Sequence, residues 1–315
     1  MRAAFVRKIE EMMPSHPNIF MLTADLGRFF DSFKENYPDN FMNCGVAEEN
    51  MVGIAGGMAW AGKKVYCYSI VPFLILRAME SIKVNVCLDK QNVILLGGGG
   101  GLVYGKDGIT HQSIEDIACM RGLPSMTIVA PGDLIEAEAI AKASLDFEGP
   151  LYIRFGRDNA PQVHKNKLDN FKIGKGIILN KGRKVALIVS GSLLYEADEA
   201  RKILQEDEKN ITLVSMPTIK PIDRDLIRDL AQTHAFIFTL EDHNVIGGLG
   251  SAVQDVLNDL NYKGKLTKIG VPDEYPKNVG SMNYLYSCYG FEPVSIASKI
   301  VSTVEQTVQH SVLNS

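Results

Sequence analysis

The feature that most constrains the fold is an alternation of short apolar runs with longer helical patterns, which occurs twice along the 315 residues. In the first half, helical patterns occupy residues 47–61, 74–88, 112–121 and 133–146. The strand-like runs around them are 18–23, 40–44, 64–69, 92–96, 126–129 and 151–154. Strands that alternate with helices form a parallel sheet with helices on both faces. The first half therefore predicts a doubly wound α/β domain.

A second alternating set follows a polar, glycine-containing segment at residues 156–183. Its strand-like runs are 185–190, 212–216, 235–240 and 265–269, and its helical patterns are 196–206, 223–232, 250–260 and 294–308. The change in pattern predicts a first domain at 1–160, a linker with a small entry hairpin at 161–183, and a second domain at 184–315. We expect the second domain to be a smaller doubly wound unit with a mixed sheet.

Composition and charge exclude several classes of protein. The net charge is −4 and no basic block occurs, so the chain is a poor candidate for nucleic acid. The longest runs without charge, 51–62 and 92–105, fall short of the ~18–20 residues of a membrane helix. The first residues form an amphipathic helix pattern and not a signal peptide, and five widely spaced cysteines without C-x-x-C suit reduced thiols. We therefore expect a cytoplasmic protein without a membrane segment.

Two glycine runs follow strand-like segments, at 97–101 and 247–250. Neither matches G-x-G-x-x-G, because the sixth positions are Leu102 and Val253, and no P-loop motif occurs. The runs serve either the local backbone conformation or the close approach of a ligand. The histidines form no H-x-H or H-E-x-x-H pattern, so we expect no metal site made by this chain alone.

Three segments carry the motifs that point to chemistry. They are NCGVAEENM at 43–51, YSIVPFL with RAME at 68–80, and GKDGITHQ at 105–112. Together with ADLG at 24–27, RDNAP at 157–161 and EDHNVIGGLG at 241–250, they resemble the transketolase family of thiamine-diphosphate enzymes over residues ~10 to ~300. The resemblance is to the pyrimidine-binding and C-terminal domains of that family, and the ordered set of motifs is much more specific than any one of them.

The resemblance implies that Glu48 binds the aminopyrimidine ring of thiamine diphosphate at N1′. A carboxyl there promotes the imino tautomer, whose nitrogen can take the proton from thiazolium C2. Glu49 is the competing assignment, and the spacing GVAE favours Glu48. Without the resemblance, a first-turn glutamate stabilised by the helix dipole would be the ordinary interpretation.

Other residues are assigned by the same resemblance. Phe73 matches an aromatic residue that stacks on the pyrimidine, and Ile70 stands where many relatives have a second aromatic residue. Val46 lies in the cofactor-binding motif, and Asp25 matches an A-D-L segment near the cofactor. The alternatives are a core position for Phe73 and a turn-forming role for Asp25.

Asp107 and His111 match a D-G-x-T-H pattern that faces the sugar hydroxyls and the reacting centre, and a histidine suits proton transfer near neutral pH. Arg157 matches an arginine that grips the sugar phosphate. Gly99 departs from the pattern, because a phosphate-binding histidine usually stands there. The substrate is therefore predicted to be a sugar or a sugar phosphate, and His243 is predicted to be structural.

The second anchor of the cofactor is missing from the sequence. In the family, Mg²⁺ and the diphosphate are held by a G-D-G motif in a separate domain, and no G-D-G occurs here. The chain is therefore expected to be the small subunit of a split enzyme, with Mg²⁺ held mainly by a partner that carries the diphosphate-binding domain, in an α2β2 assembly. The small residues at 53–61 suit either this interface or internal helix packing.

Alternative functions remain open at this point. A β subunit of a 2-oxo acid dehydrogenase shares the glutamate but usually has H-S-Q where this chain has THQ. A 1-deoxyxylulose-phosphate synthase shares D-G-x-T-H-Q but usually has an arginine before this loop, where the chain has its glycine run. A regulatory nucleotide-binding module is the non-enzymatic alternative.

Overall fold

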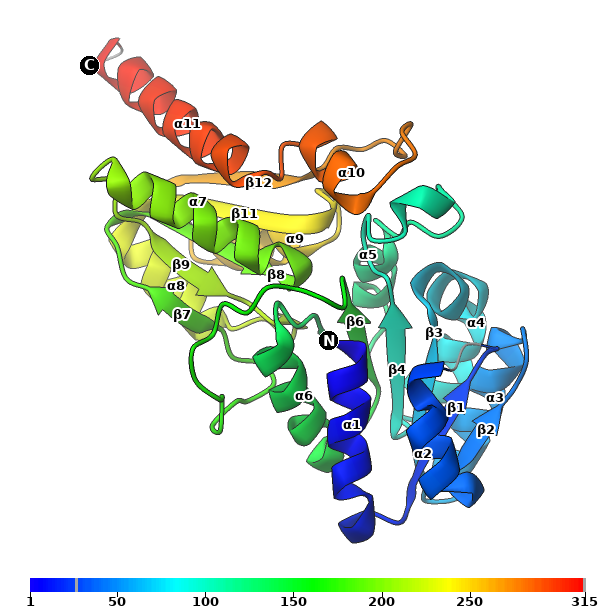
Figure 1. Cartoon of the computed structure of the whole chain (residues 1–315). Helices are drawn as coiled ribbons and strands as arrows, with labels where there is room; N and C mark the ends of the chain where they lie inside the picture. Colours follow the sequence, from blue (N-terminus) through cyan, green and yellow to red (C-terminus); the bar gives the residue numbers. More distant parts are fainter. Residues whose placement is uncertain (26–27, 314–315) are drawn as a thin grey trace.

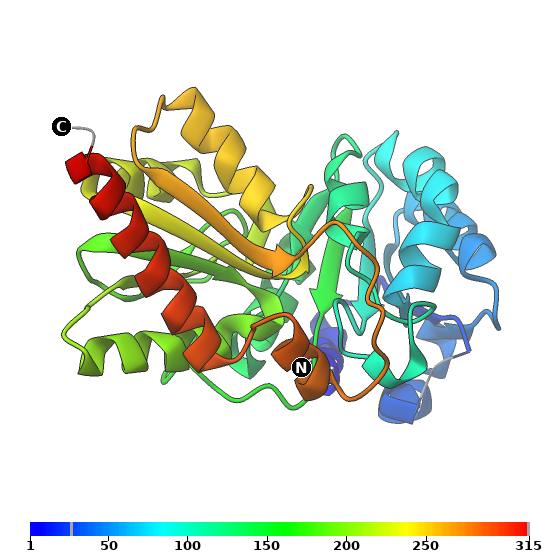
Figure 2. The same ribbon diagram turned by 90° about the horizontal axis from the view of Figure 1, so that it is seen from above.

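The computed structural model describes residues 1–25 and 28–313, and of these the side chains of Arg28 and residues 310–313 are not described. The described residues form one seven-stranded and one five-stranded sheet, in two layered α/β units that pack against each other (Figures 1 and 2). The fold class predicted from the alternating pattern is confirmed.

The first sheet has the order β10-β5-β6-β4-β3-β1-β2. Every pair in it is parallel except β10 with β5. The strands are β1 (Ile19–Thr23), β2 (Phe41–Asn43), β3 (Lys64–Ile70), β4 (Val93–Gly98), β5 (Thr127–Val129), β6 (Leu151–Phe155) and β10 (Thr218–Lys220). The register sets Thr23 beside Asn43 and Tyr68, so the carboxyl ends of these strands lie at one edge.

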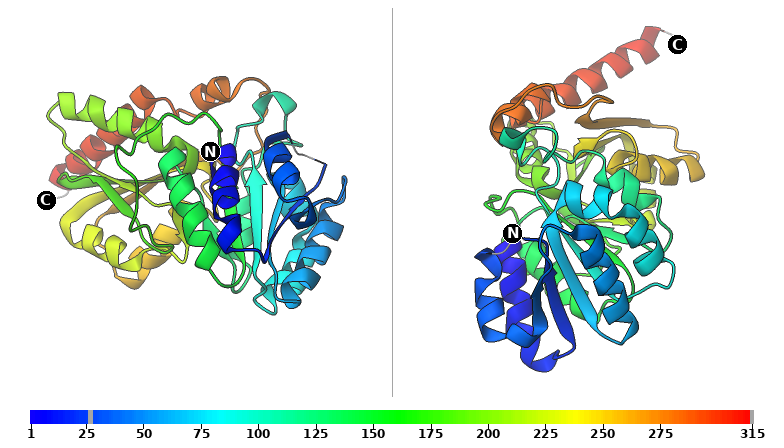
Figure 3. Two further views of the ribbon diagram at one scale, coloured as in Figure 1. Left: turned by 60° about the horizontal axis from the view of Figure 1, so that its bottom comes forward. Right: turned by 90° about the vertical axis from the view of Figure 1, so that its right-hand side faces the viewer.

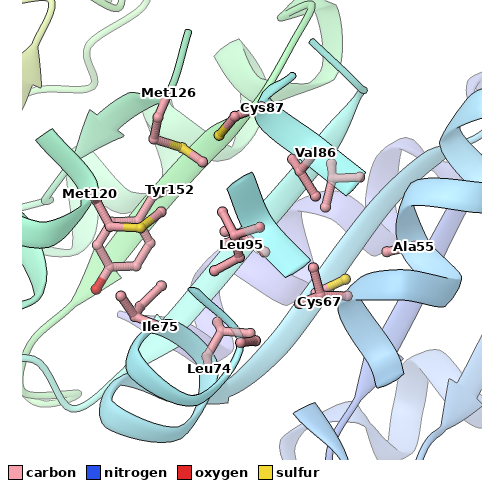
Figure 4. Close-up of a cluster of buried hydrophobic side chains, with 14 of the residues drawn as sticks. Ala55, Cys67, Leu74, Ile75, Val86, Cys87, Leu95, Met120, Met126 and Tyr152 are labelled. Atoms are coloured by element: carbon pink, nitrogen blue, oxygen red, sulfur yellow. The ribbon is translucent and has the colours of Figure 1, made fainter. Parts of the chain in front are cut away.

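Helices cover both faces of this sheet because successive strand side chains point to opposite sides. On one face, Tyr66 and Ile94 pack under α1 (Arg2–Met12), α2 (Asp31–Asn36) and α6 (Leu134–Asp146). On the other face, Cys67 and Leu95 pack under α3 (Glu48–Trp60), α5 (Asp116–Arg121) and the segment between β3 and β4, as Figure 4 shows. Asp133 caps α6 by accepting a hydrogen bond from Glu136 N at 3.0 Å.

The second sheet has the order β12-β11-β8-β9-β7, and β7 pairs antiparallel with β9. Its strands are β7 (Ile177–Asn180), β8 (Lys184–Ser190), β9 (Thr212–Ser215), β11 (His234–Asn244) and β12 (Lys265–Val271). On one face lie α7 (Leu194–Glu206), α10 (Met282–Cys288) and α11 (Pro293–Leu313), and on the other lie α8 (Arg224–Thr233) and α9 (Leu249–Asp259). The end of α11 projects away from the body of the molecule (Figures 1 and 3).

Several elements differ from the sequence expectations. β10 comes from the second half of the chain yet pairs with β5 at the edge of the first sheet. The second half of the chain therefore contributes one strand to the first unit. The expected entry hairpin is a single strand, β7. The expected helix at 74–88 is instead two stretches of π-helix, Phe73–Arg77 and Ile82–Cys87, joined by the short α4 (Met79–Ser81). No helix among the described residues is long and apolar enough to span a membrane.

Candidate functional site

The candidate site lies at the carboxyl edge of the first sheet, where ligands bind in open α/β sheets. Glu48 is the first residue of α3, which follows β2, and the π-helical segment Phe73–Arg77 follows β3. The loop that carries Asp107 and His111 follows β4. The topology therefore brings three segments that are separate in the sequence to one edge.

Glu48 is a buried carboxylate with two side-chain partners. Its side chain is 2% exposed. Ser69 Oγ donates to Oε1 at 3.2 Å, and Arg77 Nη1 donates to Oε2 at 2.6 Å. Glu49 is exposed, and both glutamates line a cavity of about 510 Å³ together with Arg77. The geometry distinguishes the two neighbours, because only Glu48 has its carboxylate buried against β3 and the Phe73–Arg77 segment.

Arg77 connects Glu48 to Phe73. Its guanidinium carbon lies 4.8 Å from the centroid of the Phe73 ring, within the range of a cation–π contact. The Phe73 ring in turn meets the His111 ring edge-on at a centroid distance of 5.2 Å. Glu48, Phe73 and His111, which the sequence assigns to one site, therefore belong to one chain of contacts that runs through Arg77.

The segment from Gly101 to Ser113 carries Asp107 and His111, and it is called the substrate loop because the resemblance assigns sugar binding to these two residues. Its two ends are joined by backbone hydrogen bonds of 2.7 and 3.0 Å between Gly101 and Ser113. Asp107 is exposed, and His111 is half-buried with Nδ1 2.9 Å from Thr110 Oγ1. The loop thus presents an exposed carboxylate and a partly exposed imidazole near Phe73.

The other residues that the resemblance assigns to the cofactor lie around the ends of β1, β2 and β3. Val46 is 72% exposed and Ile70 is half-buried at the end of β3. Asp25 is exposed with a φ of 52°, and its backbone N donates to Asn43 Oδ1 at 3.1 Å. Asn43 Oδ1 also accepts from Gly45 N at 2.9 Å, so one side chain joins the turn after β1 to the turn before Glu48. Residues 26 and 27 of the A-D-L-G motif are outside the described residues.

Gly99 has no room for a side chain. Its φ is +78°, and a Cβ there would lie 1.9 Å from the Tyr104 ring. The Tyr104 hydroxyl accepts a hydrogen bond from Arg2 Nη1 at 2.7 Å, and Arg2 is paired with Asp158. The position where relatives are expected to have a histidine is therefore filled by Tyr104 from the substrate loop.

Arg157 lies apart from the Glu48–Phe73–His111 contacts. Its guanidinium is 3.0 Å from Glu196 Oε1 on α7 and 5.9 Å from the centroid of the Tyr195 ring. Its side chain is 15% exposed. The arginine assigned to a sugar phosphate is thus already paired with a carboxylate of the second domain.

The motif at 241–250 forms a buried polar cluster on β11. Glu241 accepts from Leu249 N at 2.6 Å and Gly250 N at 2.9 Å, so it caps α9. Burial raises the pKa of Glu241 to about 7 and that of Asp242 to about 6, and it lowers the pKa of His243 to about 4. His243 is fully buried and approaches Ala118 N on α5 at 3.4 Å.

Sequence reasoning missed several residues that shape the site. Arg77, Ser69 and Asn43 each stood inside a quoted motif without an assigned role. No local sequence motif marks Arg2, because its partners Tyr68, Tyr104 and Asp158 are between 66 and 156 positions away. Among the described residues, no group of three His, Cys, Asp or Glu side chains is placed to hold a metal ion.

Comparisons with known proteins show the family to which the chain belongs. Residues 1–162 match the family described as transketolase, pyrimidine binding domain, and residues 174–296 match transketolase, C-terminal domain. The chain is 35% identical to a putative transketolase C-terminal section of Methanocaldococcus jannaschii, with 97% of this chain and 96% of the relative covered. It is 32% identical to a subunit of the apulose-4-phosphate transketolase of Phocaeicola vulgatus, with 97% of both covered.

Two further comparisons concern longer relatives and solved structures. A 1-deoxy-D-xylulose-5-phosphate synthase of Dictyoglomus turgidum is 31% identical, but the chain spans only 49% of its length. A structure described as a split gene transketolase, inactive beta4 tetramer, superimposes with a TM-score of 0.86 at 34% identity, and 96% of each chain is covered. These matches confirm the family predicted from the motifs: the chain belongs to the transketolase family and corresponds to its pyrimidine-binding and C-terminal domains.

Proposed function

We propose that this chain is the small subunit of a split transketolase, which transfers a two-carbon ketol unit between sugars with thiamine diphosphate and acts only together with a diphosphate-binding subunit. The observation that carries the proposal is the convergence of Glu48, Phe73 and His111 at one sheet edge, with the Glu48 carboxylate 2% exposed. The similarity to a split gene transketolase over 96% of both chains supports the two-subunit arrangement.

The residues present fit the aminopyrimidine of the cofactor. The contacts of Arg77 support this fit, because its guanidinium is planar, donates N–H to Glu48 and lies over the Phe73 ring. An aminopyrimidine is also planar and also has a polar edge that a carboxylate can recognise. Arg77 is 47% exposed, so its side chain has room to leave this position. When bound, thiamine diphosphate would supply the electron sink for cleavage of the ketose C–C bond.

Each of the assigned site residues then has a definite role. Glu48 would hold the pyrimidine edge and a proton at its carboxyl, and Phe73 would fix the plane of the ring. His111 and Asp107 would orient the sugar hydroxyls, and His111 would also move a proton near neutral pH. We assign Val46, Ile70 and Asp25 to the walls of the cofactor site. We assign Mg²⁺ to the partner subunit, because the G-D-G motif that holds it in the family does not occur in this sequence.

The substrate assignment follows from the residues around Gly99. Tyr104 fills the place of the expected histidine, and Arg157 is paired with Glu196. Both features weaken the contacts that this chain can give to a sugar phosphate. The assay panel therefore includes unphosphorylated sugars as well as phosphorylated ones, apulose 4-phosphate among them because two relatives are named for it.

Reconstitution with the partner subunit tests the proposal. We expect the chain alone to be inactive and the mixture to transfer ketol units in the presence of thiamine diphosphate and Mg²⁺. Full activity and tight cofactor binding by the chain alone, measured by isothermal titration, would refute the need for a partner.

A matched pair of substitutions tests the role of Glu48. Glu48→Gln should lower kcat of the reconstituted enzyme by at least ~100-fold, because it removes an acid–base group. Glu49→Gln is the control, since this neighbouring glutamate is exposed, and it should leave kcat nearly unchanged. Equal activity of the two variants would refute the assignment of Glu48 and would favour a regulatory module.

The synthase-like alternative has its own observation, the 31% identity to 1-deoxy-D-xylulose-5-phosphate synthase. Formation of 1-deoxy-D-xylulose 5-phosphate by the reconstituted pair, without ketol transfer between sugars, would decide for it.

A further inference from the structure

The substrate loop is held by the second domain as well as by the first. Leu102, at its start, and Ile114, just after its end, are buried in the hydrophobic core of the second domain with Leu187 and Phe238. Near the middle of the loop, Gly280 N donates to Gly105 O at 3.2 Å. The segment that carries Asp107 and His111 is therefore attached to both units.

Asp242, at the carboxyl end of β11, is the polar contact at the start of the loop. Its side chain is 2% exposed, and both carboxylate oxygens accept from Leu102 N, at 3.2 and 3.3 Å. Tyr286 of α10 donates its hydroxyl to Oδ2 at 2.9 Å and so fixes the carboxylate. The carboxylate also packs against Gly101, where a Cβ would lie 2.2 Å from it. The first residue of the loop can therefore lie against Asp242 only because it is a glycine, since a side chain at position 101 would clash with the carboxylate.

Arg154 links the two ends of the loop. Its Nη2 donates to Ser113 O at 3.0 Å and to Asp242 O at 2.9 Å, and its Nε donates to Asp116 at 2.8 Å. Both Arg154 and Asp116 are buried. The start of the loop, its end and the backbone of Asp242 thus belong to one hydrogen-bonded network.

From these contacts we propose that Asp242 is a positioning residue, through which the C-terminal domain sets the conformation of the substrate loop and hence the places of Asp107 and His111. The inference rests on the proposed function, because it takes the loop to be where sugars bind. Asp242 touches no reacting group itself. It acts through the backbone of Leu102, five residues before Asp107.

Hydrogen exchange tests the structural half of the proposal on the full chain. In Asp242→Ala, deuterium uptake of peptides covering residues 101–106 should be at least ~10-fold faster, because the Leu102 amide loses its acceptor. Asp242→Asn retains one oxygen acceptor and should restore most of the protection. The control is Asp223→Ala, which removes another buried carboxylate of the second domain that accepts a backbone N–H, that of Leu226 at 3.2 Å. It should leave residues 101–106 protected.

Kinetics of the reconstituted pair test the functional half. Asp242→Ala should raise the KM of the sugar substrates and lower kcat/KM by at least ~10-fold, while the Kd of thiamine diphosphate changes less than ~2-fold, since the Glu48 and Phe73 contacts are separate. Asp242→Asn should recover kcat/KM to within ~3-fold of the wild type. If Asp242→Ala does not fold, Tyr286→Phe removes only the hydroxyl that fixes the carboxylate and should show a smaller effect of the same kind.

The outcomes separate this inference from the proposed function. Unchanged uptake at 101–106 in Asp242→Ala, or an equal loss of kcat/KM in Asp223→Ala, would overturn the positioning role even in an active enzyme. A wild-type pair without ketol transfer, combined with fast uptake in Asp242→Ala, would overturn the proposed function and leave the attachment of the loop to Asp242 standing.

Discussion

At the scale of single residues, Glu48 and Arg77 form an ion pair between unequal partners. The glutamate is 2% exposed and the arginine 47%. Arg77→Leu would leave the buried carboxylate with Ser69 Oγ at 3.2 Å but without its cation. We expect a loss of about 1–2 kcal/mol in the free energy of unfolding, less than for a fully buried pair because Arg77 is partly solvated. Urea denaturation of the chain measures it.

A double variant provides the control for this prediction. In Arg77→Leu with Glu48→Gln, the carboxylate charge that lost its partner is gone, so most of the lost stability should return. Losses that simply add in the double variant would show that the two side chains do not interact in solution.

The raised pKa of Glu241 makes the stability of the chain depend on pH, and one substitution isolates this effect. Burial raises its pKa to about 7, so the folded chain holds a proton that the unfolded chain has lost between about pH 4.5 and 7. The stability of the wild type relative to Glu241→Gln should therefore fall as pH rises through this window, by up to about 3 kcal/mol. Urea denaturation of both proteins at pH 5 and pH 8 measures the change. A difference that stays constant with pH would contradict it.

The sequence predicts the residues whose roles are carried by local motifs. Glu48, Phe73 and His111 each stand in a recognisable stretch, and the parallel sheet brings those stretches together. It cannot predict Arg2 or Asp242 as neighbours of the substrate loop, because Tyr104 lies 102 residues from Arg2 and Leu102 lies 140 residues from Asp242. Such pairs are set by how whole elements pack.

At the scale of elements, α3 offers adjacent glycines in opposite environments. A Cβ on Gly56 would lie 2.6 Å from Asn85 O, whereas a Cβ on Gly57 would meet nothing within 4 Å. Gly57→Ala should stabilise the chain by about 0.5–1 kcal/mol through helix propensity. Gly56→Ala should destabilise it by about 1–3 kcal/mol through overpacking. Thermal unfolding of both variants checks this, and equal shifts would contradict the close packing of α3 against the segment Ile82–Cys87.

The same comparison explains part of the small-residue stripe. Ala55, Gly56 and Ala59 are buried inside this chain, while Gly57 and Trp60 are exposed. Internal packing thus accounts for one side of α3, and the other side is free in this chain. Neither periodicity nor composition could separate the two sides, since both carry small residues.

The π-helical segments within residues 73–88 and the strand β10 could not be predicted from the sequence, for physical reasons. The periodicity of 74–88 suits a helix, but five or six residues of π-helix give nearly the same pattern, and the wider turns place Phe73 and Arg77 at the site. β10 is only three residues long, and its partner β5 lies about ninety residues earlier in the chain. Its pairing depends on the docking of the two units and not on local preference.

At the scale of the whole molecule, each unit contains residues from the other half of the chain. β10 of the second half completes the first sheet, and Leu102 and Ile114 of the first half complete the second core. Arg154 and Asp116 form a buried ion pair of 2.8 Å that also reaches the backbone of Asp242. Neither unit keeps its full core without the other, so we expect one unfolding transition although the chain has two sheets.

Two probes in urea, at one protein concentration, test this expectation. Thiol labelling, read at the peptide that contains the buried Cys67 of β3, reports the first unit, and far-UV circular dichroism reports both. In the wild type the two transitions should coincide. Arg154→Leu leaves Asp116 buried without its cation and should cost about 3–5 kcal/mol, and because Arg154 also holds the backbone of Asp242 in the second unit, both probes should shift together. Labelling of Cys67 that precedes the change in circular dichroism would mean that the first unit opens alone, and the shared strand and shared core would then contribute little to holding the units together.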